Sequence, residues 1–238
     1  MRRLLLSFMA VSVVANFVAT PVASAQQSLN LFLGGFVPTS ADARGTTTNG
    51  VSNDVLVADQ NFLAFPLNRF RGPSLGGEWL VALGDKFEAG AGLGFYQSSV
   101  NAVDANFVNA NGSEVVSNLK LRIVPFTATI RVLPFGHKAP IQPYVGAGVG
   151  VFAWRYSETG QFVDPTDNSI FSGNFVGSGT KTGPVVLGGL RVPIGPMAPG
   201  FEIRWQSAKG TLPTNQGFAG TVIDLGGFNY LFTFNIGF

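Results

Sequence analysis

Apolar and polar residues alternate along much of this chain, most regularly in its last eleven residues. Successive residues of a strand point to opposite faces, so residues 228–238 are predicted to form a strand with one apolar and one small or polar face. A soluble sheet would bury such an aromatic face in a core. The apolar face comprises Phe228, Tyr230, Phe232, Phe234, Ile236 and Phe238.

The same alternation predicts seven earlier strands. They cover residues 29–37, 75–83, 87–99, 119–133, 142–157, 182–192 and 200–208, and the eighth strand begins between Val222 and Phe228. Three connections are short, at 84–86, 134–140 and 193–199, and four are long and polar, at 39–71, 101–117, 158–181 and 209–220. The first long connection also holds apolar residues, so part of it is expected to fold onto a rim or to extend a hairpin.

Long and short connections alternate along the chain. Outer-membrane barrels have long loops on one side and short turns on the other, with both termini on the turn side. We therefore predict an all-β fold, an eight-stranded antiparallel up-and-down transmembrane β-barrel. The alternative is a soluble β-barrel, which could hide its aromatic faces inside but would not require this alternation.

The N-terminus has the three parts of a secretory signal. Arg2 and Arg3 precede an apolar stretch from Leu4 to Val18, and Ala23 and Ala25 form a small-residue cleavage site before Gln26. We therefore expect a cleaved signal peptide at 1–25 and a single barrel domain at 26–238. No later stretch approaches the ~18 consecutive apolar residues of a helical span.

Charge and composition narrow the possible functions. The chain has 15 basic and 13 acidic residues, and removal of Arg2 and Arg3 leaves equal numbers, so nucleic acid is not an expected partner. There are no cysteines and one histidine, so we expect no metal and no cofactor. Asp164 and Asp167 are thin evidence for calcium. His137 lies in a predicted turn and is expected to be solvated surface.

Six charged residues share the polar parity of the strands and are predicted to point into the barrel. An eight-stranded barrel is just wide enough for side chains to fill, and buried charges must pair. We expect a ladder of salt bridges that closes the lumen, with interior glycines leaving room for the long side chains. A narrow pore and a lumenal catalytic site are the alternatives. The six residues are Glu78, Glu88, Arg131, Arg191, Glu202 and Arg204.

Two basic residues share the parity of the apolar set instead. Lys120 and Arg122 stand in line with Val124 and Phe126. Either they lie beyond the hydrocarbon, near acidic lipopolysaccharide head groups, or a bulge near Pro125 reverses the parity. In the next strand, Arg155 is expected at the same rim.

With eight strands in place, the chain resembles the OmpA/OmpX-type small outer-membrane β-barrels. The resemblance rests on the signal peptide, the segment from Pro143 to Gly150, the paired interior charges and the terminal Phe238. It implies that the barrel-assembly machinery and periplasmic chaperones recognise the C-terminal aromatic face. That face includes Tyr230, Phe232, Phe234, Ile236 and Phe238.

The resemblance implies a monomeric, non-enzymatic protein of the cell outer membrane, in contact with its lipid and lipopolysaccharide. Its role would be envelope structure or surface interaction through the extracellular loops. The alternative is a narrow pore or an OmpW-like channel for small or hydrophobic solutes. A lipid-acting enzyme is a third hypothesis, but the residues expected of one are not evident here.

Overall fold

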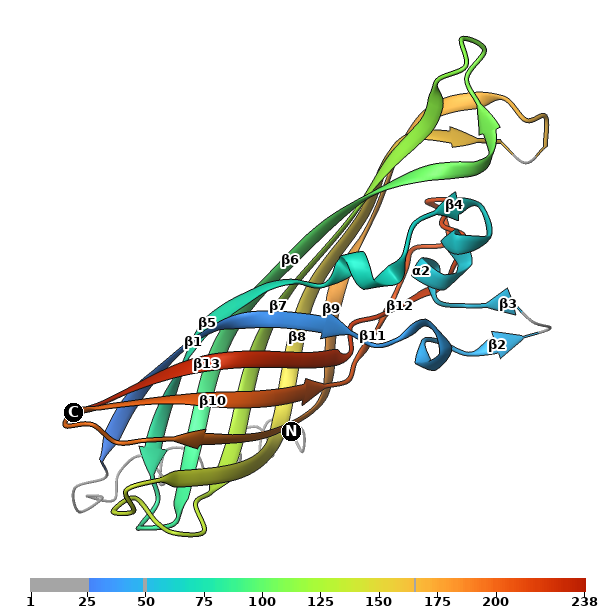
Figure 1. Ribbon diagram of the computed structural model, residues 1–238. Helices are drawn as coiled ribbons and strands as arrows, with labels where there is room; N and C mark the ends of the chain where they lie inside the picture. Colours follow the sequence, from blue (N-terminus) through green and yellow to red (C-terminus); the bar gives the residue numbers. More distant parts are fainter. Residues whose placement is uncertain (1–25, 49–50, 165) are drawn as a thin grey trace, which may run out of the picture.

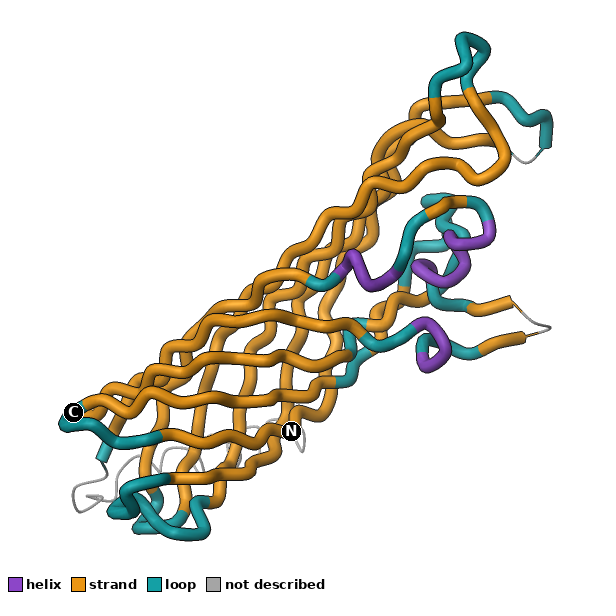
Figure 2. Tube along the Cα trace, viewed as in Figure 1, coloured by secondary structure: helices purple, strands orange, loops and turns teal. Residues whose placement is uncertain are grey.

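The computed structural model describes residues 26–48, 51–164 and 166–238, which form a β-barrel (Figures 1 and 2). Eight strands make the barrel wall. They are β1 (Gln27–Pro38), β5 (Gly72–Ala82), β6 (Phe87–Val108), β7 (Glu114–Val132), β8 (Gln142–Val163), β9 (Ile170–Arg191), β10 (Met197–Gln206) and β13 (Gly227–Gly237). The predicted signal peptide, with Ala23 and Ala25, lies outside the described residues, and Gln26 is exposed just before β1.

The eight strands close into a ring. Each pairs antiparallel with its neighbours, in the order β6-β5-β1-β13-β10-β9-β8-β7, and β7 pairs with β6 to complete the circle. The first and last strands are neighbours, with Leu29 opposite Ile236. Where all eight strands are present, closure leaves no free strand edge, so each strand is hydrogen-bonded on both sides. The eight-stranded antiparallel barrel predicted from the sequence is confirmed.

The two ends of the barrel differ. One end, which we call the turn end, carries three connections at 83–86, 133–141 and 192–196, together with the start of β1 and the C-terminus (Figure 1). The opposite, loop end carries the other four connections. Both termini of the barrel therefore lie at the turn end, as the alternation of connections predicted.

Two of the predicted long loops are wrong. Residues 101–117 and 158–181 are mostly strand, so β6 to β9 continue well beyond the other four strands and leave only short connections at 109–113 and 164–169. Cross-strand pairs such as Ser99 with Lys120 and Thr159 with Asn174 build this extension. In β9, many residues between 170 and 181 are exposed on both faces, so this part of the extension has no regular alternation and its sequence resembles a loop.

The first connection folds over the loop end. It contains η1 (Ala41–Ala43), β2 (Thr47–Thr48), β3 (Val51–Ser52), α2 (Val55–Ala58), η2 (Asp59–Asn61), β4 (Leu63–Ala64) and η3 (Leu67–Phe70). We call residues 54–70 the cap. Val55, Leu56 and Phe70 of the cap are fully buried in one apolar cluster with side chains of the barrel wall. The fourth connection adds β11 (Lys209–Thr211) paired with β12 (Val222–Asp224), so β12 is separate from the last barrel strand.

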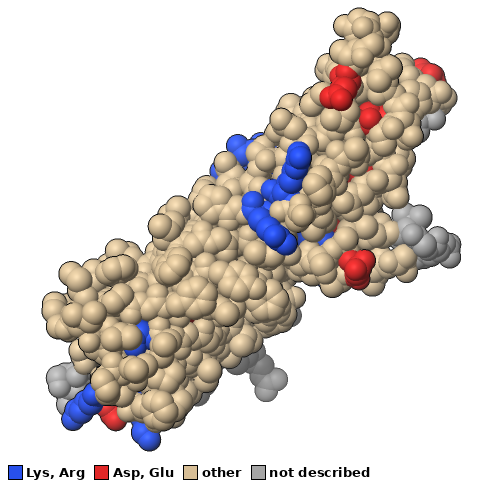
Figure 3. Space-filling model, viewed as in Figure 1, with Lys and Arg blue, Asp and Glu red and all other residues tan. Residues whose placement is uncertain are grey.

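The outer face of the ring is an apolar belt. Figure 3 shows a broad stretch of wall with almost no charged side chain, while Lys and Arg gather towards its ends. No helix in the described part of the chain is long and apolar enough to span a membrane. Exposed side chains of the belt include Leu31, Leu33, Leu75, Trp79, Leu93, Phe126, Ile130, Val149, Val186, Ile203, Phe232 and Phe234.

Lys120 and Arg122 point outward, in line with Phe126, and the inward parity of β7 is unbroken from Leu119 to Arg131. The alternative of a bulge at Pro125 is therefore wrong, since the register with β8 is continuous through this residue. Both cations lie towards the loop end of the belt. Arg155 is directly opposite Arg122 across β7 and β8, at the rim where it was expected.

A charge placed in the middle of the belt tests whether it faces hydrocarbon. Val149 is 64% exposed on the part of β8 that lies within the belt, and V149R is expected to lower the free energy of unfolding in a lipid bilayer by about 2–4 kcal/mol. The measurement is denaturant unfolding of protein folded into vesicles. As a control, A105R on the exposed extension of β6 should cost less than about 1 kcal/mol. Equal losses for the two variants would contradict a lipid-facing belt.

Candidate functional site in the barrel interior

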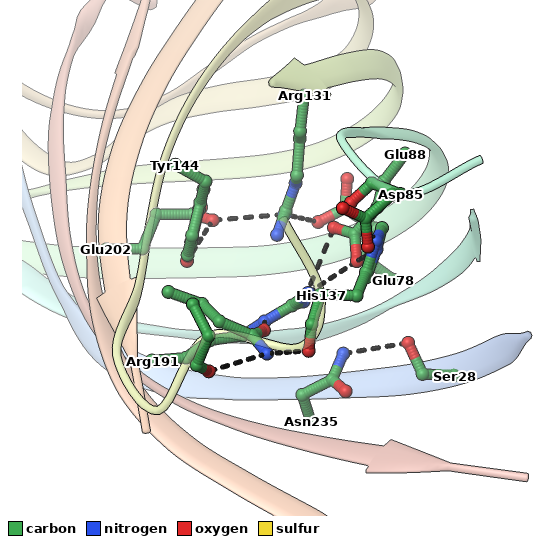
Figure 4. A network of polar contacts seen from close by, with 12 residues as sticks. Ser28, Glu78, Asp85, Glu88, Arg131, His137, Tyr144, Arg191, Glu202 and Asn235 are labelled. Atoms are coloured by element: carbon green, nitrogen blue, oxygen red, sulfur yellow. Dashed lines mark hydrogen bonds and ion pairs between the residues drawn. The ribbon is translucent and has the colours of Figure 1, made fainter. Parts of the chain in front are cut away.

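The six charges predicted from the sequence lie together inside the turn-end half of the barrel. Figure 4 labels all of them except Arg204. They come from five strands, because inward positions recur at every second residue of each strand. All six are at most 5% exposed. Glu78 is on β5, Glu88 on β6, Arg131 on β7, Arg191 on β9, and Glu202 and Arg204 on β10.

Four of these residues form a closed ring of ion pairs. Arg131 contacts Glu78 directly and lies 3.0 Å from Glu202 Oε2. Arg204 Nη2 lies 2.9 Å from Glu78 Oε2 and 2.8 Å from Glu202 Oε1. Each acid thus contacts both bases, and the ring carries no net charge. Alternating signs in a water-poor interior give each charge the partner that its desolvation requires.

A second group lies nearer the turn end, around Glu88. Arg191 donates to both carboxylate oxygens of Glu88, at 2.5 and 3.3 Å, and to Gln142 Oε1 at 2.8 Å. His137 reaches the same carboxylate from the 133–141 turn, with Nε2 3.0 Å from Glu88 Oε1. The prediction that His137 is solvated surface is therefore wrong, since its side chain is only 15% exposed.

The surroundings of His137 favour its charged form. Its Nδ1 lies 2.6 Å from the carbonyl oxygen of Asp85, and Nε2 faces Glu88. A carbonyl and a carboxylate only accept, so both ring nitrogens must donate, which requires the imidazolium. The hydrogen bond to Glu88 accordingly raises the pKa of His137 above its usual value. A turn has no periodicity, so nothing in the sequence pattern indicated this contact.

Tyr144 joins the two groups. Its hydroxyl donates to Glu202 Oε2 at 3.1 Å, and the Arg131 guanidinium lies 4.8 Å from its ring centre. The Arg191 guanidinium lies 5.9 Å from the same ring. A tyrosine between two guanidiniums supplies cation–π attraction as well as a hydrogen bond. Its inward parity on β8 could have been read from the sequence.

Glycines make room for these long side chains. A Cβ on Gly90 would lie 2.5 Å from Glu78 Oε1. A Cβ on Gly200 or Gly146 would meet the wall itself first, at 2.4 Å from Leu190 O and 2.7 Å from Ile130 O, with Arg191 and Arg131 next. The long charged side chains thus occupy the space that the glycines leave inside the barrel. An eight-stranded barrel is narrow enough for side chains to fill it in this way.

The loop-end half of the interior is apolar, so the predicted ladder of salt bridges closes only the turn-end half of the lumen. Phe36, Tyr96, Phe152 and Tyr156 project inward and are at most 3% exposed. They belong to the same cluster as the buried cap residues. On β8, the inward positions are glycines at 146, 148 and 150 and become large at Phe152 and Tyr156. This change from small to large side chains marks the boundary between the polar and the apolar half of the interior.

A buried ion pair fastens the cap region. Arg44 Nε lies 2.9 Å from Asp54 Oδ1, and both side chains are fully buried. Arg44 also donates to the carbonyl of Asp224 at 2.8 Å, and the backbone N–H of Asp224 donates to Asp54 Oδ2 at 2.7 Å. These bonds tie the start of α2 to β12, and Asp54 also caps the helix through Leu56 N–H.

Two acids meet beneath the cap. Asp59 of η2 and Glu158 on the extension of β8, beyond the belt, are each 4% exposed. The Tyr156 hydroxyl donates to Asp59 Oδ2 at 3.1 Å. Burial, followed by repulsion from Glu158, raises the pKa of Asp59 well above its usual value, and burial raises the pKa of Glu158 to about 7. The pair is therefore most stable when at least one acid is protonated.

The remaining sequence candidates have structural contacts of their own. Asp164 and Asp167 accept from the backbone N–H groups of Thr166 and Ser169, so each orders its loop. In the described residues no three His, Asp or Glu side chains gather as metal ligands. Tyr230, Phe232, Phe234 and Phe238 are exposed on the outer face, whereas Ile236 is half-buried, and the Phe238 ring packs edge-on against Trp79 at 5.8 Å.

Removing one base of the ion-pair ring should destabilise the barrel. R204A leaves Glu78 and Glu202 sharing Arg131 alone, and we expect a loss of roughly 3–5 kcal/mol because a buried charge becomes uncompensated. The loss in the free energy of unfolding is measured by denaturant unfolding, and heat-modifiable gel mobility shows whether the barrel is folded. K138A, which removes an exposed base from the 133–141 turn, is the matched control. Unchanged melting of R204A would refute the role assigned to this ring.

The acid pair should make the cap sensitive to pH. Both folded-state pKa values are raised, so the stabilisation is complete below about pH 4 and is lost as the pH rises through about 7. Hydrogen exchange of the cap amides should be about tenfold or more faster at pH 8 than at pH 5, after correction for intrinsic rates. D59N should flatten this dependence, and D42N on the exposed η1 should not. An equally steep dependence in D59N would exclude the pair as its cause.

No family model matches this chain, and no curated protein sequence matches it. Solved structures do resemble it in three dimensions. Ail, the attachment invasion locus protein of Yersinia pestis, solved in complex with the heparin analogue sucrose octasulfate, is 10% identical with a TM-score of 0.41, over 90% of this chain and 99% of Ail. Neisserial surface protein A is 14% identical with a TM-score of 0.47, over 90% of this chain and 98% of that protein.

Proposed function

We propose that this chain is a non-enzymatic integral protein of the bacterial outer membrane, of the OmpA/OmpX type. Its closed barrel contributes to envelope structure, or to surface interaction through the parts that project outside. The observation that carries the proposal is a continuous apolar belt on the outside of a barrel whose interior, in its turn-end half, is filled by ion pairs. A soluble barrel would have the opposite arrangement, with its apolar face inside.

The lengths of the strands support the proposal that each strand crosses the membrane once. β1, β5, β10 and β13 contain 12, 11, 10 and 11 residues. A tilted strand crosses the hydrocarbon in about 9–11 residues. The other four strands contain 22, 19, 22 and 22 residues, so roughly half of each would stand outside the bilayer. With the turn end in the periplasm, this extension and the cap face the exterior.

The proposal includes the route to the membrane. The signal peptide at 1–25 would be cleaved between Ala25 and Gln26, and periplasmic chaperones would carry the chain to the barrel-assembly machinery. Tyr230, Phe232, Phe234, Ile236 and Phe238 would form the recognised segment. Ring closure leaves no strand edge in the belt, which favours a monomer surrounded by lipid and lipopolysaccharide.

The filled interior weighs against the channel alternative. The ion-pair ring occupies the turn-end half, and the apolar cluster with the cap occupies the loop-end half. A solute would have to displace both layers. His137 is held by Glu88 and Asp85, so its contacts give no support to a lumenal catalytic centre.

Bilayer recordings separate the closed barrel from a channel. We expect purified, heat-modifiable protein to show no stable single-channel openings in a planar bilayer, because both halves of the lumen are filled. Deletion of the cap alone should leave the barrel closed, since the ion-pair ring remains. Stable openings of the unmodified protein would overturn the closed-barrel proposal and favour the pore. Turnover in lipid A hydrolysis or acyl-transfer assays would revive the enzyme hypothesis.

A further inference from the structure

Three basic side chains stand on the outer face just beyond the belt. Lys120 and Arg122 are on β7, and Arg155 is on β8 directly opposite Arg122. All three are exposed. They line a hollow of about 280 Å³. The rest of its lining is mostly polar, from Gln97, Ser157, Thr159, Asn174 and Val176.

The charge of this basic patch is not balanced by the protein. Like charges directly opposite each other on neighbouring strands repel and destabilise the sheet. In the described part of the chain, none of the three cations has a carboxylate within 4 Å, in contrast to the paired arginines of the interior. A bound anion would remove the repulsion, and guanidiniums match the geometry of phosphate oxygens.

An apolar groove of about 840 Å³ lies next to the patch on the turn-end side, over β5 to β8. On β7, Arg122 is followed on the outer face by Val124, Phe126 and Ala128, at about 7 Å per pair of residues. The floor of the groove is made of small residues, with Ala91 opposite Ala128 in register. Its walls are larger side chains, including Leu75, Leu93, Phe95, Phe126, Val149 and Val151.

We propose that the basic patch and the groove together bind lipid A, the phosphorylated acyl glycolipid of the outer leaflet. A phosphate would sit between Arg122 and Arg155 with Lys120 beside it, and an acyl chain would lie in the groove. Gln97, Ser157 and Thr159 supply hydrogen-bonding groups at the level of the sugar. The inference rests on the proposed function, because it needs the loop end to face the outer leaflet.

Charge and shape both select this occupant. The cations lie at the boundary of the belt, where a lipid phosphate resides, and the groove runs from them into the hydrocarbon level. A zwitterionic phospholipid carries a cation of its own, which the three cations of the patch would repel. A soluble anion would neutralise the cations of the patch, but it has no acyl chain that could occupy the groove.

The test uses the barrel folded into phosphatidylcholine nanodiscs free of lipopolysaccharide. Insertion and heat-modifiable mobility there test the proposed function without lipid A. Native mass spectrometry then follows binding of bisphosphorylated lipid A, its dephosphorylated form and inorganic phosphate. We expect R122Q/R155Q to weaken lipid A binding about tenfold or more, and K138A to leave it unchanged.

A groove variant distinguishes a glycolipid site from an anion site. A91F fills the floor with a side chain that lipid tolerates, so folding should persist while lipid A binding weakens several-fold and phosphate binding does not. Three outcomes overturn the inference in a correctly inserted protein. They are equal binding of the dephosphorylated form, no loss in R122Q/R155Q, and no loss in A91F.

Discussion

The pairing of Glu78 and Glu202 with Arg131 and Arg204 is the constraint on which the barrel wall depends. Four buried charges alternate in sign within hydrogen-bonding distance, so moving any one strand by two residues would leave a charge unpaired. The ring joins β5, β7 and β10, none of which pairs with another. It therefore fixes the register across the lumen, where no ladder of hydrogen bonds can act.

The same constraint explains where small residues lie. The large charged side chains leave space only for glycine at some neighbouring inward positions, as at Gly90, where a Cβ would lie 2.5 Å from Glu78 Oε1. Towards the loop end the inward positions change to Phe152, Trp154 and Tyr156. There apolar contacts close the interior, and buried charges lie at the cap, where Arg44 pairs with Asp54 and Asp59 meets Glu158.

The inward position of the charged residues could be predicted, because the alternation of side chains along a strand is a local property of the sequence. Glu88 and Arg131 were assigned inward from their own strands, without knowledge of their partners. The partners could not be predicted, since Glu78 and Arg204 are 126 residues apart and the sequence carries no register between such strands. His137 was missed because a turn lacks periodicity. The extension of β6 to β9 was missed because its residues are mostly polar and, in β9, exposed on both faces, so they do not alternate regularly with apolar ones.

The unequal strand lengths give the cap its place. Beyond the belt, β7 and β8 still turn Leu119, Leu121 and Tyr156 inward, while β1, β10 and β13 have already ended. Those apolar faces would be open to water on the side of the short strands. In Figure 1 the cap lies on the side of the short strands. Val55, Leu56 and Phe70 of the cap share one buried cluster with the inward side chains of the long strands. The first connection must therefore be long, since it has to supply the wall that four short strands leave out.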